Sequence, residues 1–160
     1  MWGLAREVFG KEKYDEALNL YDKLLAINPD KKLYLLNKSV CLTNLRRYDE
    51  AEQILFRLNY EDPDNLNVAR VLAWALTCDS KFEQAGRLYD QLMAVENPPE
   101  GDMLNCGFYL WFTGKIDEAA SCFRSCGQNV YDQIKNEAYL LDKNNIIEEE
   151  IKMMFDLIGV

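Results

Sequence analysis

Histidine is absent from this chain of 160 residues. Imidazole is the most common general base and a frequent metal ligand, so its absence argues against many hydrolase and metal-site classes. The sequence also lacks any apolar run long enough to cross a bilayer, which takes about 18 residues or more. Since its opening residues are not a charged segment followed by an apolar one, we expect neither a membrane span nor a leader peptide.

The chain also contains fewer basic than acidic residues. The chain carries 18 lysines and arginines against 27 aspartates and glutamates, for a formal net charge of −9. This sign repels phosphate backbones, and no stretch rich in lysine and arginine offers a local exception. Nucleic acid is therefore excluded as the expected partner.

Cysteine is present but follows no ligand or disulfide pattern. The five cysteines are an odd number, they are scattered, and none forms a C-x-x-C motif. Structural zinc takes four ligands, whereas Cys106, Cys122 and Cys126 offer three thiols without a histidine. We expect reduced core thiols in a cytoplasmic compartment, with no metal and no cofactor.

The strongest signal in the sequence is an internal repeat. Four similar segments (YDEA, YDEA, FEQA and IDEA) end in alanines that are 34 residues apart: Ala17, Ala51, Ala85 and Ala119. A column of small residues keeps the same interval: Ala5, Ser39, Ala73 and Gly107. Matched sizes at a fixed interval predict helices that approach closely within each unit.

These columns resemble the tetratricopeptide repeat family, whose unit is a helix–turn–helix of 34 residues. The resemblance implies an all-α fold, a right-handed α-solenoid of antiparallel helix hairpins with about ten helices. A single array would fill residues 1–160, with repeats at about 1–31, 32–65, 66–99 and 100–128 and degenerate capping helices at 129–160. The sequence departs from the family at the turn, where only Gly114 is glycine and Glu12, Arg46 and Ser80 take its place.

Both ends of the array leave alternatives open. Met1 falls inside the first unit, so either the chain continues upstream or a short first helix at about 2–9 frays. After Gly127 the period fails, although two amphipathic helices are predicted to begin near Asn129 and Asn145. These helices either cap the last repeat or fold back into the groove and regulate access to it.

The resemblance implies that the first helix of each repeat lines a concave groove in which family members bind peptides. Carrying the groove columns over gives the expected contact residues: Leu36, Val40, Arg70, Trp74, Leu104, Phe108 and Trp111. Aromatic residues with arginine are typical of protein-binding hot spots. The alternative is that the aromatics are core, with Phe112 packing between repeats, and that Arg70 pairs with a carboxylate.

The expected function is therefore a protein–protein interaction module and not an enzyme. One subgroup of the family grips a C-terminal carboxylate with lysine, asparagine and arginine, but the matching positions here include Leu36, Val40 and Trp74. An apolar ligand, such as an amphipathic helix or an extended peptide, fits this groove better. The alternatives are a chaperone-like holder of a secreted or nascent client, and a self-assembly element that forms a weak homo-oligomer through an uncapped first repeat.

Overall fold

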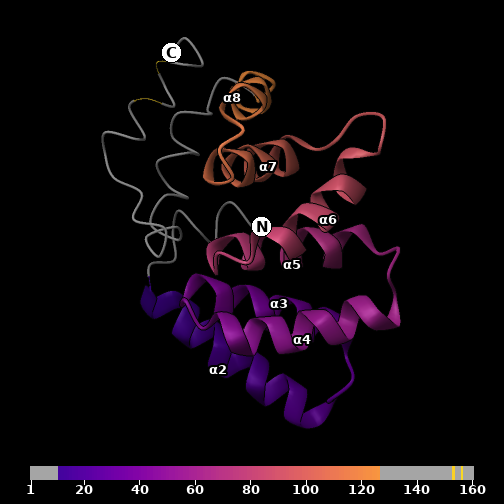
Figure 1. The fold of residues 1–160 in the computed structure, drawn as a ribbon. Helices are drawn as coiled ribbons and strands as arrows, with labels where there is room; N and C mark the ends of the chain where they lie inside the picture. Colours follow the sequence, from indigo (N-terminus) through magenta and orange to yellow (C-terminus); the bar gives the residue numbers. More distant parts are fainter. Residues whose placement is uncertain (1–10, 127–152, 154–155, 157–160) are drawn as a thin grey trace. The chain divides into compact units, whose positions relative to one another are not determined.

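The computed structural model describes residues 11–126 together with the single residues 153 and 156. Within these residues the chain is all-helical, without strands (Figure 1). The helices are α2 (Lys11–Ile27), α3 (Lys32–Asn44), α4 (Tyr48–Glu61), α5 (Leu66–Cys78), α6 (Phe82–Met93), α7 (Glu100–Phe112) and α8 (Ile116–Arg124). The described part thus holds seven helices where about ten were predicted for the chain. The helix expected at 2–9 and those expected after 127 lie outside the described residues.

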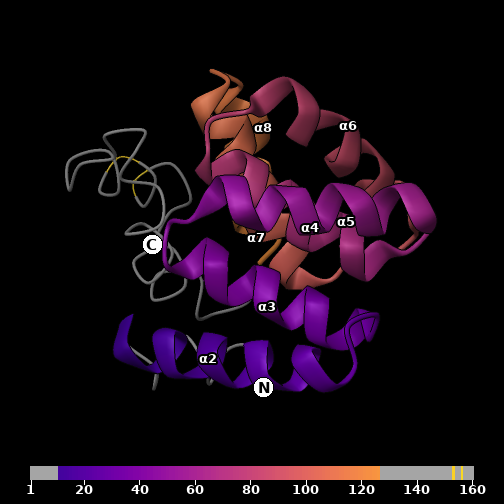
Figure 2. The same ribbon diagram turned by 90° about the horizontal axis from the view of Figure 1, so that it is seen from below.

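The helices fall into two compact units, Met1–Ala75 and Leu76–Val160, and the boundary lies within α5. In the first unit α3 packs against both α2 and α4, and the three helices lie side by side (Figures 1 and 2). In the second unit α7 packs against both α6 and α8. Packing of each helix on its neighbours in the chain is the arrangement of helical-repeat proteins. The division into one array of four repeats stays a prediction.

Three turns in the structure share one backbone geometry and recur every 34 residues. Their central residues have positive φ: Arg46 (63°), Ser80 (63°) and Gly114 (82°). Across each turn, the following backbone N–H donates to the carbonyl five residues earlier: Arg47 to Leu42 (2.8 Å), Lys81 to Leu76 (2.8 Å) and Lys115 to Leu110 (2.9 Å). A left-handed residue with this hydrogen bond ends a helix in the way that glycine favours. At these three positions the repeat read from side chains is also a repeat of the backbone, whereas Glu12, the other predicted turn position, lies within helix α2.

Because the turn imposes a left-handed conformation, its cost depends on which residue occupies it. We expect Arg46→Gly and Ser80→Gly each to raise the free energy of unfolding by about 0.5–1 kcal/mol, since glycine adopts positive φ without a Cβ penalty. Gly114→Ala should lower it by about 1 kcal/mol for the same reason. Urea denaturation of the three variants measures these changes, and a destabilising Ser80→Gly would contradict the shared turn geometry.

The columns of small residues are buried, with one exception. Ala51, Ala85 and Ala119 are completely inaccessible to solvent. Their predicted partners in the preceding helix are also buried: Ser39, Ala73 and Gly107. Ala17 differs because it is only half-buried, and its predicted partner Ala5 lies outside the described residues.

One hairpin shows how close the helices come. A Cβ atom on Gly107 of α7 would lie 2.5 Å from Cε1 and 2.8 Å from Cδ1 of Phe123 on α8. Real Cβ atoms do not approach other atoms this closely, so the absence of a side chain at Gly107 makes room for the Phe123 ring. The ring of Phe108 meets Phe123 edge-on, with centroids 5.5 Å apart. The α7–α8 contact is consequently a closely packed aromatic core.

Candidate protein-binding surface

Helix α3 carries the first two residues predicted to contact a partner. Leu36 and Val40 lie one turn apart, and both are half-buried. Polar side chains of the same helix donate to its own backbone, as Thr43 Oγ1 does to the carbonyl of Ser39 (2.8 Å) and Asn44 Nδ2 to that of Val40 (2.9 Å). The accessible parts of Leu36 and Val40 offer aliphatic contact one helical turn apart on α3.

Helix α5 carries Arg70 and Trp74, again one turn apart. Arg70 is half-exposed and donates from Nη1 to Oδ1 of Asn67, in the preceding turn. The structure thus gives Arg70 an amide acceptor, which sequence reasoning did not consider. Trp74 is buried.

The predicted contact residues of α7 are all buried: Leu104, Phe108 and Trp111. Phe108 has no solvent exposure and packs on Phe123, so its position favours the core alternative. Phe112 stacks on Phe82 of α6, with ring centroids 6.1 Å apart and an interplanar angle of 15°. This contact confirms the alternative in which Phe112 packs between successive hairpins.

The seven predicted residues therefore differ in how a partner could reach them. Leu36, Val40 and Arg70 are partly accessible, and all three belong to the unit that ends at Ala75. The other four are buried, and direct contact between them and a partner stays a prediction: Trp74, Leu104, Phe108 and Trp111.

Sequence reasoning did not consider four large side chains of the first unit that are exposed. They lie on α2, α3 and α4: Ile27 (85%), Leu33 (57%), Phe56 (40%) and Tyr60 (88%). These four residues, named here the loop-end surface, lie outside the predicted groove columns. Isolated exposed apolar residues are common. Each of these four lies within three residues in the sequence of a member of the ionic network described next.

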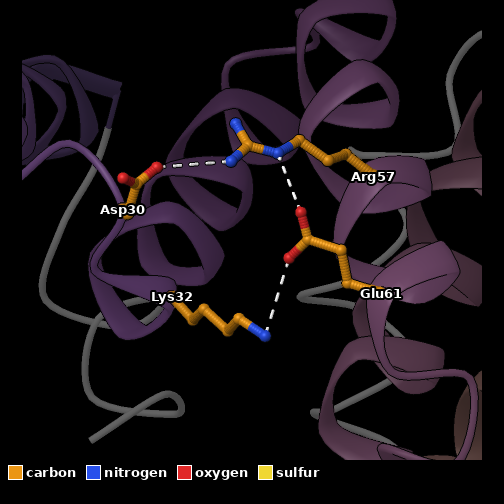
Figure 3. A network of polar contacts seen from close by, with 4 residues as sticks. All are labelled: Asp30, Lys32, Arg57 and Glu61. Carbon is orange, nitrogen blue, oxygen red and sulfur yellow. Dashed lines mark hydrogen bonds and ion pairs between the residues drawn. The ribbon is translucent and has the colours of Figure 1, made fainter.

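Four charged side chains form that network between the α2–α3 turn and the end of α4 (Figure 3). Arg57 donates from Nε to Glu61 (3.1 Å) and from Nη2 to Asp30 (3.4 Å), while Lys32 Nζ lies 3.6 Å from Glu61. The hydrogen bond from Arg57, followed by the charges of Arg57 and Lys32, lowers the pKa of Glu61 against the opposing effect of desolvation. Because all four groups are exposed, the network positions the turn more than it stabilises the fold.

A similar ion pair joins α3 to α2. Lys38 Nζ on α3 lies 2.7 Å from Oδ1 of Asp22 on α2. The lysine stem can cover apolar surface while its charged end reaches a carboxylate. The ion pair therefore adds a contact between neighbouring helices.

The cysteines do not form a metal centre of the kind considered from the sequence. Cys106, Cys122 and Cys126 do not bring their sulfur atoms within 4.8 Å of one another as a group of three. None of the five cysteines forms a disulfide, and Cys41, Cys78 and Cys106 are buried. Among the described residues, no helix combines the length and the apolar character needed to cross a membrane.

Repeated hairpins with a common turn define a helical-repeat protein. Comparison with protein families is consistent with this class, because a family model described as Tetratricopeptide repeat matches residues 8–75. The match and the consecutive helices show that this part of the chain belongs to the tetratricopeptide repeat family. Searches among curated proteins and solved structures found no match.

Proposed function

We propose that this protein is an interaction module that binds a peptide or an amphipathic helix of a partner protein. Tetratricopeptide repeats are in general protein–protein interaction modules and non-enzymatic scaffolds. The observation that carries the proposal is the set formed by Leu36, Val40 and Arg70, which are partly accessible on helices of the matched family region. We propose further that the chain has no catalytic activity of its own and acts in the cytoplasm without a cofactor.

The three accessible residues favour a particular kind of ligand. Leu36 and Val40 offer aliphatic contact one helical turn apart, and Arg70 offers a guanidinium group that can bind a carboxylate or carbonyl oxygen. A ligand with apolar residues beside an acidic one satisfies both features. Trp74, Leu104, Phe108 and Trp111 would add to binding only where their burial is relieved on association.

The repeats are proposed to continue beyond the matched residues. The turns at Ser80 and Gly114 have the backbone geometry of the turn at Arg46, and Ala85 and Ala119 are buried as Ala51 is. This equivalence supports four units at about 1–31, 32–65, 66–99 and 100–128, followed by capping helices.

Charge reversal at Arg70 tests the binding mode. We expect Arg70→Glu to reduce recovery of the partner about 30-fold in affinity capture from the native source, since arginines at protein interfaces are often hot spots worth about 2 kcal/mol. The matched control is Arg87→Glu, because Arg87 lies on α6, is exposed, and pairs only at the surface with Glu83 (3.1 Å). Equal recovery by both variants would reject the proposed site.

A second pair of variants tests the aliphatic contact. Val40→Asp on α3 should also release the partner, whereas Gln53→Asp at an exposed position of α4 adds the same charge and should retain it. Melting curves for each variant separate loss of binding from loss of folding. Recovery of copies of this chain alone would support the self-assembly alternative instead.

A further inference from the structure

The first turn of α5 is fixed by a cap and by its buried side. Asn65 directly precedes the helix, and its Oδ1 accepts hydrogen bonds from the backbone N–H groups of Asn67 (3.0 Å) and Val68 (3.4 Å). Such bonds satisfy donors that the start of a helix otherwise leaves unpaired. Val68 and Ala69 are buried, which ties this turn to the core. The side chains on the exposed side of the turn therefore extend from a fixed backbone.

Two polar side chains that belong to this part of α5 contact each other. Arg70 donates a hydrogen bond from Nη1 to Oδ1 of Asn67, three residues earlier. Residues three apart lie on the same side of a helix, so this contact directs the guanidinium along α5 towards its first turn. The acceptor that Asn67 supplies is an amide oxygen without net charge, so this hydrogen bond orients the guanidinium and does not neutralise it.

The helices do not need a polar pair at these positions. The residues 34 positions earlier are Leu33 and Leu36 of α3, and those 34 positions later are Gly101 and Leu104 of α7. All three segments are helical, so neither asparagine nor arginine is required there for the helix. Because the contact in α5 is exposed to water, it also adds little to the stability of the fold. A role in binding accounts for the pair better than a role in folding does.

We propose that Asn67 is a positioning residue for Arg70 in the partner-binding site and makes this site selective for a carboxylate of the partner over a neutral amide. This inference rests on the proposed function, because Arg70 is one of the three residues that carry it. A side chain that is already oriented loses less freedom on binding, which is worth about three- to tenfold in affinity. A carboxylate benefits most, because its charge attracts the guanidinium in addition to accepting a hydrogen bond from it.

The probe for the test is a peptide selected from a random display library on the full chain, together with a copy in which one acidic residue is replaced by its amide. We expect the acidic peptide to bind the wild-type chain about tenfold more tightly than the amide peptide in calorimetric titrations. Asn67→Ala should weaken binding of the acidic peptide about three- to tenfold and that of the amide peptide less than about twofold. The control is Asn19→Ala, the same truncation at an exposed position of α2, which should change neither affinity.

A positioning role has a second signature that does not require a peptide. In NMR relaxation measurements, the order parameter of the Arg70 Nε–Hε group should fall in Asn67→Ala, because the guanidinium is no longer held. Asn67→Asp keeps an acceptor of the same shape and should retain the order parameter. It should nevertheless weaken binding of the acidic peptide about threefold or more, because the added carboxylate repels that of the peptide.

The Arg70→Ala variant distinguishes failure of this inference from failure of the proposed function. If the acidic and amide peptides bind the wild-type chain equally, or if Arg70→Ala binds both as the wild type does, the binding role of Arg70 is rejected and that of Asn67 with it. If Arg70→Ala loses the preference while Asn67→Ala keeps both its affinity and its order parameter, only the positioning role is rejected. Because Asn67 acts through Arg70, the double alanine variant should bind no more weakly than Arg70→Ala, and additive losses would also reject the positioning role.

Discussion

Truncation of Phe108 to alanine is expected to lower the free energy of unfolding by about 3–5 kcal/mol, measured by urea denaturation. The side chain is completely buried and packs edge-on against Phe123, so its removal leaves a cavity that the α7–α8 contact cannot easily close. A groove residue would behave differently, because its truncation would weaken partner binding with little change in stability. The measurement therefore decides between the groove and core interpretations of Phe108.

The control for this prediction is Phe56→Ala on α4. Phe56 is 40% exposed in the loop-end surface, so the same truncation removes fewer contacts there. We expect a loss of about 1 kcal/mol or less, in proportion to the smaller apolar area involved. Similar losses at both positions would show that Phe108 is not the core residue that the structure indicates.

Replacement of Gly107 by alanine is expected to cost about 2–3 kcal/mol, although only one methyl group is added. That methyl group would lie 2.5 Å from the ring of Phe123, and Phe108 restricts the movement of this ring. Overpacking of a filled core typically costs about 1–3 kcal/mol. Thermal or urea denaturation of the variant provides the measurement.

Two further variants identify the cause of that loss. Gly101→Ala lies on the same helix, where an added Cβ meets nothing within 4 Å, and it should be neutral or stabilising by up to about 1 kcal/mol. Phe123→Leu should relieve the clash, so the double variant with Gly107→Ala should be more stable than the sum of the single losses predicts. Strict additivity of the two losses would argue against the contact.

The sequence was sufficient to predict the all-helical class and the residues at which three of the helices begin. Helices α4, α6 and α8 begin at Tyr48, Phe82 and Ile116, which open the repeating segments that end in alanine. The prediction has a physical basis. Packing against a neighbouring helix restricts the size of the contacting residue, and this restriction recurs at a constant interval along the sequence. The family resemblance, stated from the same columns, agrees with the match over residues 8–75.

The accessibility of the predicted contact residues could not be obtained in the same way. Helical spacing predicts which residues share one side of a helix, as Phe108 and Trp111 do on α7, but it does not reveal which residues cover that side, since these are distant in the chain. The loop-end surface was missed for the opposite reason. The exposure of Ile27 and Tyr60 depends on where their helices end, and this position is the least regular feature of a repeat.

The left-handed turns at Arg46 and Ser80 bear on how such a chain can change over time. Two residues without the freedom of glycine adopt the backbone path that Gly114 adopts, because the hydrogen bond across the turn and the burial of the adjoining helices outweigh their local preference. A turn can therefore keep its backbone geometry after its sequence has lost the glycine by which the turn is usually identified. Each turn is also a point at which a whole hairpin could be gained, lost or exchanged without altering the path of the flanking helices.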